Sequence, residues 1–356
     1  MQKVSSLGIK VVYPCVWNKN SAFWKSSTIQ KTLGESAISE YGDRDILQEF
    51  VDEASLLGLK VFPWFEYGLK VVVKKGPDTA SSELTESGKI FLHKGWLTSN
   101  REGDVTMPFK WGVQKGFLNP ENDKVKTFLN NIMIELSSYD VEGVVIDDHF
   151  SMHPDYAYNK RSSYRSESRS HKQNLDISAI KISSITNLLV NLGQTIRSAG
   201  KKFILSPAGD LNFSKSKWMQ DWFSVVESGV VSQLLLQAYR YNLNGFKNLL
   251  KNYHFNASRN HTELGVVILA GLKNNTKMDG RLISEQSKVA QMKNLKTSYF
   301  FYDTLLKPAS GKESQTQRLD AMKSILSTTK QVENEPSISD SIIKGLGKSL
   351  GFNDFI

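Results

Sequence analysis

The chain has 356 residues, of which 40% are hydrophobic and 23% are charged, a composition that excludes wholesale disorder and a long coiled coil. Its formal net charge is +9, with 45 Lys and Arg against 36 Asp and Glu, so the charge balance permits an anionic polymer as a partner. No apolar run approaches the roughly 20 residues of a membrane-spanning helix, and the single cysteine, Cys15, excludes an intrachain disulfide and a cysteine-based zinc cluster.

Seven short apolar runs recur along the chain and predict strands that are buried on both faces, as in a parallel sheet. They span residues 8–17, 58–68, 141–150, 201–209, 230–240, 264–272 and 296–305. Helical patterns lie between them, most clearly at 43–58, 121–139, 176–200 and 312–329. Asp43 and Gly58 suit the two ends of the first of these helices, and Gly200 suits the end of the third.

Alternating strands and helices predict either a (β/α) barrel or an open doubly wound sheet. No glycine-rich nucleotide motif follows any strand, which removes the best support for the doubly wound sheet. Polar and aromatic residues instead cluster at the C-terminal ends of the strands, where the loops of a barrel build its active site. The predicted fold class is therefore α/β, a TIM (β/α)8 barrel of glycosidase type.

The predicted barrel is short of one strand, because a closed barrel has eight strands and the sequence has only seven such runs. The chain also opens on MQKVSSLG, which resembles the last turns of a helix that leads into a strand. We therefore predict that the first strand is missing at the N-terminus. The barrel is expected to span residues 1–330, and residues 331–356 are expected to form a polar C-terminal tail with a short helix.

Two connections, at 67–120 and 151–175, are longer than most loops in compact domains, and such loops are usually functional or disordered. The second is rich in serine and carries five basic residues: Lys160, Arg161, Arg165, Arg169 and Lys172. It is interpreted either as a lip that attracts an anionic polymer or as a solvated loop.

Adjacent carboxylates end the third strand, in 143-GVVIDDHF-150. Asp147 is the stronger catalytic candidate, because a carboxylate aimed into an apolar barrel is costly unless it has a function. Asp148 is either part of the same site or a cap or partner for a nearby loop residue. His149 shares one side of the strand with Asp147, since side chains alternate between faces.

A further carboxylate, Glu66, ends the preceding strand in 61-VFPWFEYG-68. Adjacent strands lie about 4.8 Å apart, so Glu66 and Asp147 could reach the separations that glycosidases use, ~5–5.5 Å for retention or ~6.5–9.5 Å for inversion. The aromatic neighbours Trp64, Phe65 and Tyr67 could raise the pKa of Glu66 and so suit it to general-acid catalysis. The alternative is that Glu66 is a structural partner of an arginine such as Arg240.

Other strand ends carry side chains that could bind or stack on sugar rings. The candidates for substrate binding are Trp17, Asn18, Trp64, Tyr67, Gln237, Tyr239, Arg240, Tyr302 and Asp303. The competing interpretation is a metal site formed by Asp147, Asp148, His149, His153 and Asp155. No H-E-x-x-H motif supports this site, and we expect no metal or other cofactor. Cys15 lies within a predicted strand and is interpreted as a small core residue.

Several motifs together resemble the glycosyl hydrolase-like 10 family of bacterial (β/α)8 proteins. They are IKVVYPCVWN (9–18), LKVFPWFEYG (59–68), HKGWLT (93–98), FLNPENDKV (117–125), YDVEGVVIDDHF (139–150), QAYR (237–240) and FFYDTL (300–305). The resemblance implies glycosidase activity, and the family includes periplasmic enzymes that cut the glycan strands of peptidoglycan. It also implies a strand before the first one here, and Asp303 stands where the family usually has Glu.

We therefore expect a glycoside hydrolase that acts on a bacterial cell-wall or exopolysaccharide glycan, and not on nucleic acid. Asp147 would be the nucleophile or base and Glu66 the general acid, while Asp148 and His149 would orient them. The alternatives are a non-catalytic carbohydrate-binding barrel and a metal-dependent polysaccharide deacetylase or phosphoesterase. No signal peptide is visible, so the compartment is left open, although the resemblance implies a periplasmic or extracellular protein. The oligomeric state is also left open.

Overall fold

The computed structural model describes residues 1–34, 41–158, 171–251, 262–272, 278–309 and 313–333. The chain forms two compact units, one of Met1–Ser5 with Lys10–Ala238 and one of Ser6–Ile9 with Tyr239–Ile356. Within the described ranges, no helix is both long enough and apolar enough to cross a bilayer. Residues 334–356 of the predicted tail and residues 160–170 of the basic segment lie outside the described residues.

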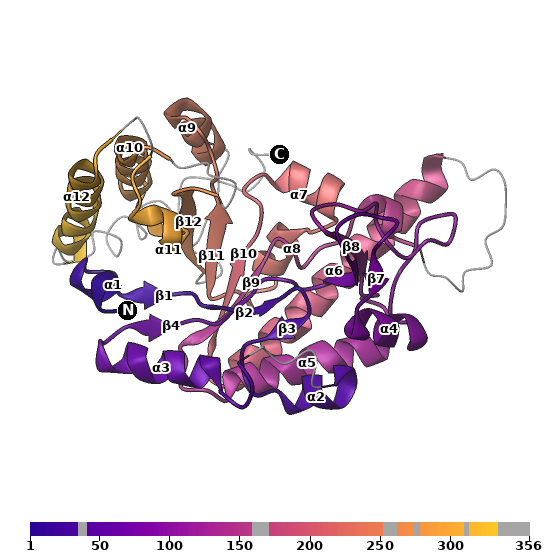
Figure 1. The fold of residues 1–356 in the computed structure, drawn as a ribbon. Helices are drawn as coiled ribbons and strands as arrows, with labels where there is room; N and C mark the ends of the chain where they lie inside the picture. Colours follow the sequence, from indigo (N-terminus) through magenta and orange to yellow (C-terminus); the bar gives the residue numbers. More distant parts are fainter. Residues whose placement is uncertain (35–40, 159–170, 252–261, 273–277, 310–312, 334–356) are drawn as a thin grey trace. The chain divides into compact units, whose positions relative to one another are not determined.

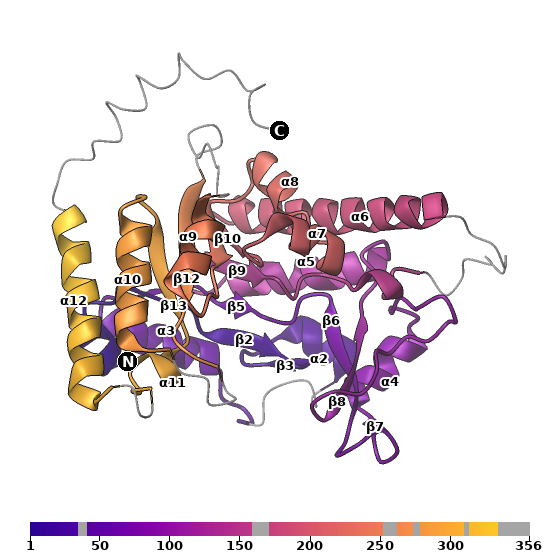
Figure 2. The same ribbon diagram turned by 90° about the horizontal axis from the view of Figure 1, so that it is seen from above.

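The first unit is built on a largely parallel sheet whose strands follow the order β11-β10-β9-β5-β2-β3 (Figures 1 and 2). These strands are β2 (Cys15–Asn18), β3 (Ser21–Ala22), β5 (Trp64–Phe65), β9 (Gly143–Asp147), β10 (Lys202–Ser206) and β11 (Gln233–Gln237). Only β3 runs antiparallel to its neighbour, β2. A short separate pair, β1 (Val11–Val12) with β4 (Lys60–Val61), precedes β2 and β5 along the chain.

Prolines divide the first two predicted strands. Pro14 lies between β1 and β2, and Pro63 lies between β4 and β5. Proline has no backbone N–H to give to a sheet, so each ladder is interrupted at that point. The carbonyl oxygen of each proline still accepts a hydrogen bond from the neighbouring strand, at 2.7 Å from the N–H of Trp64 and at 2.9 Å from the N–H of Val145.

Helices alternate with strands along the first unit, as predicted, and one short helix precedes the first strand. They are α1 (Gln2–Ser6), α2 (Ser27–Leu33), α3 (Ile46–Leu56), α5 (Asp123–Ser137), the 3-10 turn η2 (Pro154–Tyr156), α6 (His171–Ser198), α7 (Leu211–Trp218) and α8 (Trp222–Glu227). Figure 1 shows α5 and α6 packed side by side along the sheet. Asp45 caps α3, and the prediction that Asp43 begins this helix is wrong by two residues. Gly58 and Gly200 follow helix ends at φ 63° and 74°, as expected of terminal glycines.

Gly143 lets β9 and β10 approach closely at the start of their five-residue parallel pairing. A Cβ atom at this position would lie 2.1 Å from the carbonyl oxygen of Lys202, its partner in the ladder. Any side chain would therefore push the two strands apart. The register that glycine permits pairs Ser206 with Asp147 at the other end of the ladder.

Residues 67–120 form a folded insertion, where the sequence predicts only a long connection. Strand β6 (Lys70–Lys75) pairs antiparallel with β7 (Glu83–Leu84) on one side and with β8 (Val113–Phe117) on the other. Helix α4 (Glu86–His93) packs on this small sheet (Figure 2). Val71, Val72 and Val73 are all buried, so the insertion has its own apolar core.

The second unit contains the last two predicted strands, β12 (Glu263–Leu269) and β13 (Lys296–Phe300), which pair in parallel over five residues. Its helices are α9 (Leu243–Lys251), α10 (Gly280–Gln291), α11 (Tyr302–Leu305) and α12 (Gln315–Glu333). Arg318 of α12 is fully buried, lies 2.7 Å from Glu313 and donates to the carbonyl oxygen of Met278. All seven predicted strand segments are thus present, and the fold is of the α/β TIM-barrel type. A strand before Met1 stays a prediction.

Glu135 of α5 joins this helix to the start of α2. One carboxylate oxygen accepts hydrogen bonds from Thr28 N at 2.8 Å, Thr28 Oγ1 at 2.7 Å and Ser27 Oγ at 2.9 Å. The other accepts from Ser26 Oγ and from Trp24 Nε1. Burial raises the pKa of Glu135, but the hydrogen bonds from Ser26 and Thr28 outweigh it, so the pKa is lowered.

We expect Glu135→Gln to lower the free energy of unfolding at pH 7 by about 1–2 kcal/mol, a charge-assisted contribution reduced by partial exposure. A lowered carboxyl pKa stabilises the fold above the unfolded value, and that stabilisation is lost as pH falls through the folded pKa. Urea unfolding of both proteins should therefore show a difference at pH 7 that shrinks in acid. Glu53→Gln, at an exposed position of α3, is the control and should change little. An equal effect of both substitutions would contradict the bridging role.

Candidate functional site

Carboxylates follow two neighbouring parallel strands of the first unit at the same level. Phe65 of β5 pairs with Ile146 of β9, so Glu66 and Asp147 occupy the next position of each strand. Alternation places Glu66 on the same side as Trp64, whose indole Nε1 donates to Asp147 Oδ2 at 2.8 Å. Glu66 and Asp147 therefore lie on the same side of the sheet, as the sequence predicts.

Asp147 is buried, with 2% of its surface exposed. Both oxygens accept hydrogen bonds, Oδ2 from Trp64 and Oδ1 from the backbone N–H of His149 at 2.9 Å. Burial raises the pKa of Asp147 to about 6, against the opposing effect of His149. This carboxyl group therefore takes up a proton close to neutral pH.

The imidazole of His149 lies close to the carboxylates of both Asp147 and Asp148. Its Nδ1 is 3.7 Å from Asp147 Oδ2 and 3.7 Å from Asp148 Oδ1, which is ion-pair range but too long for a hydrogen bond. The imidazole stacks on the ring of Tyr67, with centroids 5.2 Å apart and planes at 10°. Burial lowers the pKa of His149, but Asp147 and Asp148 outweigh it, and the net shift is upward. The two carboxylates therefore favour the protonated form of His149.

Asp148 is more accessible than Asp147, with 27% of its side chain exposed. Gln237, at the end of β11, donates its amide Nε2 to Asp148 Oδ1 at 3.0 Å and to the carbonyl oxygen of Ser206 at 2.9 Å. This amide fixes one carboxylate oxygen of Asp148 at the ends of β10 and β11. The other oxygen, Oδ2, accepts none of the hydrogen bonds described here.

Glu66 is half-buried and is held by two residues of β2. Asn18 Nδ2 donates to Glu66 Oε2 at 2.5 Å, and the thiol of Cys15 lies 3.3 Å from the same oxygen. Burial, followed by the negative charge of Glu66, raises the pKa of the Cys15 thiol. Cys15 is therefore a neutral neighbour of the site, where the sequence predicts only a core residue.

Gln220 fixes the turn that carries Asp148 and His149. Its buried Nε2 donates to the carbonyl oxygens of Asp147 at 3.0 Å and of Phe150 at 3.1 Å, the two ends of the turn. Phe150 also packs against Gly68, where a Cβ atom would lie 2.2 Å from its ring. The two motifs that carry the carboxylates are therefore held together by close packing.

Sequence reasoning missed two residues at this site, Gln220 and Lys70. Gln220 lies outside every motif, and only its contacts reveal its role. Lys70 begins β6 and is buried, with its Nζ 4.6 Å from the centroid of the Trp218 ring. A lysine directly before the apolar run Val71–Val73 was the available signal, because lysine is rarely buried without a partner or a function.

Several predicted sugar-binding residues have other contacts. Trp17 belongs to the core, where its ring stacks on Phe65 with centroids 5.7 Å apart, so its ring face is already covered by protein. Tyr67 is buried against His149, and its hydroxyl accepts a hydrogen bond from Lys115 at 3.1 Å. Trp64 holds Asp147.

Four predicted residues belong to the second unit. Tyr239 stacks on Phe300, and the guanidinium of Arg240 donates to the carbonyl oxygen of Tyr239 at 2.9 Å. Tyr302 and Asp303 begin α11 and are exposed. A sugar-binding role for these four residues stays a prediction.

Asp147, Asp148 and His149 are also the candidate metal ligands. One ligand atom of each lies within 4.8 Å of the other two. Both oxygens of Asp147 already accept hydrogen bonds, so a metal ion would have to share or displace one of them. His153 and Asp155 lie 3.6 Å apart and are not members of this three-residue group.

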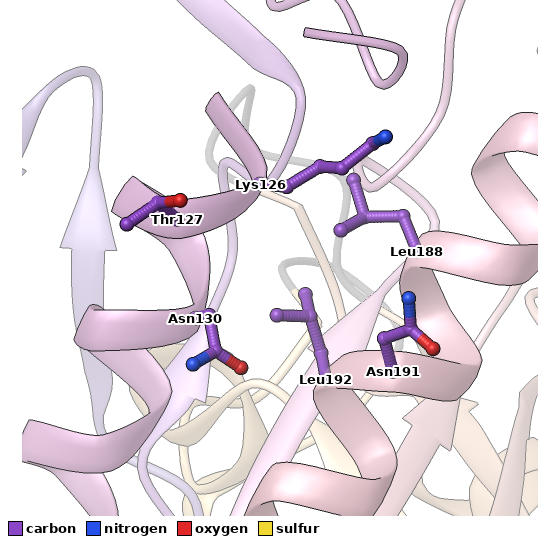
Figure 3. Close-up of a pocket in the computed structure, with 6 residues that line it drawn as sticks. All are labelled: Lys126, Thr127, Asn130, Leu188, Asn191 and Leu192. Carbon is purple, nitrogen blue, oxygen red and sulfur yellow. The ribbon is translucent and has the colours of Figure 1, made fainter. Parts of the chain in front are cut away.

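A hollow of about 240 Å³ lies between α5 and α6 (Figure 3). It is lined by Lys126, Thr127 and Asn130 of α5 and by Leu188, Asn191 and Leu192 of α6. None of these residues is a carboxylate, and the hollow lies between two helices that cover the sheet. Its lining offers no group for acid–base catalysis, so the candidate site is the cluster at the strand ends.

Comparisons with known proteins agree with this fold and these motifs. Glycosyl hydrolase DigH of Escherichia coli K12 is 27% identical over 218 residues, which are 59% of this chain and 46% of DigH. The same protein of Shigella flexneri matches equally, so the match spans about half the length of these relatives.

Solved structures also resemble the chain. The glycoside hydrolase domain of PgaB (BpsB) from Bordetella bronchiseptica has a TM-score of 0.61 and 11% identity, with 91% of each chain covered. Alpha-L-fucosidase isoenzyme 2 from Paenibacillus thiaminolyticus also has a TM-score of 0.61, with 14% identity over 93% of this chain and 46% of that one. Identities this low show the fold alone. The family pattern of glycosyl hydrolase-like 10 matches residues 1–287, and the chain belongs to this family.

Proposed function

We propose that the protein hydrolyses O-glycosidic bonds in a bacterial cell-wall or exopolysaccharide glycan. The observation that carries this proposal is the pair of partly exposed carboxylates, Glu66 and Asp148, at the ends of neighbouring parallel strands. A proton-holding pair, Asp147 and His149, lies next to Asp148. The family and the names of the relatives, which are glycosyl or glycoside hydrolases, support the same reaction class.

The burial of Asp147 changes the roles assigned from the sequence. A nucleophile or a base has to touch the sugar or the attacking water, and Asp147 is 2% exposed with both oxygens engaged. Asp148 has the accessible oxygen and lies next to His149. We therefore assign Asp148 as the general acid, His149 as its proton partner and Asp147 as the group that controls the charge of His149.

Glu66 then acts from the second strand as the nucleophile or the base. In the first step, Asp148 protonates the glycosidic oxygen as the bond to the anomeric carbon breaks. If Glu66 attacks that carbon, a water deprotonated by the now ionised Asp148 then breaks the bond between Glu66 and the sugar and releases the product. If Glu66 acts as the base, it removes a proton from a water that attacks the carbon directly. Asn18 and Cys15 hold Glu66 Oε2, which leaves Oε1 to react. The proton that Asp148 gives up is replaced through His149 or from water.

Amide substitutions distinguish this assignment from the pair Asp147 and Glu66. We expect Glu66→Gln and Asp148→Asn each to lower kcat on a peptide-free glycan by about 10²–10⁴-fold. Asp147→Asn should lower kcat by a smaller factor and should shift the pH profile of kcat. On an aryl glycoside whose leaving group needs no protonation, Asp148→Asn should recover activity while Glu66→Gln should not. Steady-state kinetics on both substrates measures these effects.

Asp140→Asn is the matched control, since this exposed carboxylate precedes β9 at the end opposite the site. A loss in Asp147→Asn with near-full activity in Asp148→Asn would restore the pair assigned from the sequence. If the unmutated chain binds glycans and hydrolyses none, the protein is the non-catalytic carbohydrate-binding barrel.

The pKa of Asp147 also predicts a pH dependence of stability. A carboxyl pKa raised to about 6 stabilises the fold below the unfolded value near 4, and this contribution is lost as pH rises through about 6. The raised pKa of His149 acts in the same direction, because that contribution too is lost as pH rises. As pH rises from 4 to 8, urea unfolding should show the free energy of unfolding of Asp147→Asn increasing by up to about 3 kcal/mol relative to that of the unmutated chain. A pH-independent difference would contradict a buried, titrating Asp147.

The metal-dependent alternative is favoured by one observation, the proximity of ligand atoms on Asp147, Asp148 and His149. We expect EDTA to leave hydrolysis of the glycan unchanged, since the two-carboxylate route needs no metal. Activity should be assayed before and after EDTA, and again after Zn²⁺ or Mg²⁺ is added. Loss with EDTA and recovery with one of these ions would contradict the metal-free two-carboxylate route and favour metal-dependent chemistry at this cluster.

A further inference from the structure

Two lysines of the insertion lie beside the carboxylates without forming an ion pair. Lys70 is 7% exposed, and its Nζ lies over the ring of Trp218. Lys115 Nζ donates to the hydroxyl of Tyr67 and lies 5.1 Å from the centroid of that ring. In the described part of the chain, neither ammonium group has a carboxylate oxygen within 4 Å.

The small sheet of the insertion places these lysines together. Lys70 pairs with Phe117, and Val72 pairs with Lys115, so the two lysines are diagonal neighbours on one face of β6 and β8. The pKa of Lys70 is lowered to about 8 by burial first and then by the charge of Lys115. Asp148, Asp147 and Glu66 oppose this shift, which places Lys70 in the field of the site.

A cationic and aromatic surface extends from the site along the insertion. The pKa of Lys115 is lowered by burial first and then by the charge of Lys19, while Glu66 opposes the shift and Lys110 adds to it. Lys110 Nζ lies 4.3 Å from the centroid of the Trp111 ring, and Lys115 Nζ lies 6.0 Å from it. Trp111 is 80% exposed, which leaves most of its indole open to solvent. An exposed indole beside ammonium groups suits a sugar ring that carries an anion.

Burying a lysine without an anionic partner costs free energy, and the protein keeps this lysine within reach of its proposed catalytic carboxylates. None of these carboxylates forms an ion pair with Lys70. An external anion would supply the charge partner that Lys70 has no carboxylate to provide within 4 Å.

We propose that Lys70 and Lys115 bind a carboxylate carried by the glycan, so that the substrate is an acidic polysaccharide. The inference rests on the proposed function, because it places the anionic sugar next to the bond that Asp148 and Glu66 would cleave. Lys70 and Lys115 are binding residues here and take no part in proton transfer. They would hold the carboxylate while Trp111 contacts a neighbouring ring.

The test compares a peptide-free glycan whose sugars carry carboxylates with the same glycan after those carboxylates have been reduced to alcohols. Binding is measured by titration calorimetry, which does not require hydrolysis. We expect the unmutated chain to bind the acidic glycan about 10- to 100-fold more tightly than the reduced one, the usual size of one or two charge-assisted contacts. Lys70→Met keeps the apolar stem and should remove most of this preference, and Lys115→Gln should weaken it.

Lys89→Met is the matched control, because this lysine is exposed on α4 of the same insertion and pairs with Glu86. It should leave the preference unchanged. Binding of the acidic glycan should also weaken as pH rises through about 8, where Lys70 loses its proton, and this dependence should be absent in Lys70→Met. Circular dichroism spectra of each variant verify that the fold is retained.

Equal affinity for the two glycans, or a preference that survives in Lys70→Met, would overturn the acidic-substrate inference and leave the hydrolase proposal intact. Preferential binding of the acidic glycan without any hydrolysis would have the opposite result. It would support the anion site and overturn the glycosidase.

Discussion

The burial of one carboxyl group, that of Asp147, is the constraint on which the rest of the site depends. A carboxylate is costly to place among apolar strand ends, and here the indole N–H of Trp64 and the backbone N–H of His149 offset that cost. These two donors bring β5 and β9 into a fixed relation and draw the imidazole of His149 toward the acids. The neighbouring Asp148, which Gln237 holds, is left facing outward.

The strands and most helices could be predicted, because buried parallel strands have a strong apolar signal that local sequence carries by itself. The start of α3 was misplaced, since Asp43 and Asp45 are chemically equal caps and only the fold selects Asp45. The insertion was not foreseen as a folded sheet with a helix. Its strand β7 is only two residues long, and both are exposed. Strand β6 is stabilised by β8, which lies about 40 residues away in the chain.

At the site, the motifs located the carboxylates at the ends of β5 and β9 but could not give their exposure. Alternation along a strand gives the side on which Asp147 lies, but it cannot show that Trp64 covers it or that Asp148 remains accessible. The burial of Trp17 could not be predicted for the same reason: an aromatic residue at a strand end has the same sequence signal whether it faces a cleft or packs on another ring, here that of Phe65. Gln220 and Lys70 could not be assigned from sequence, because their roles arise only from contacts between distant segments.

In the proposed site, bond cleavage and binding of the charge on the substrate are assigned to side chains from different segments of the chain. The carboxylates come from the ends of strands β5 and β9, whereas both lysines come from the added sheet of β6 and β8. A hairpin of different charge could be transplanted between β5 and β9 without altering the residues assigned to bond cleavage. Relatives that share the same chemistry could then have diverged in the polymers they accept by exchanging this one segment, and the segment offers protein engineers the same freedom.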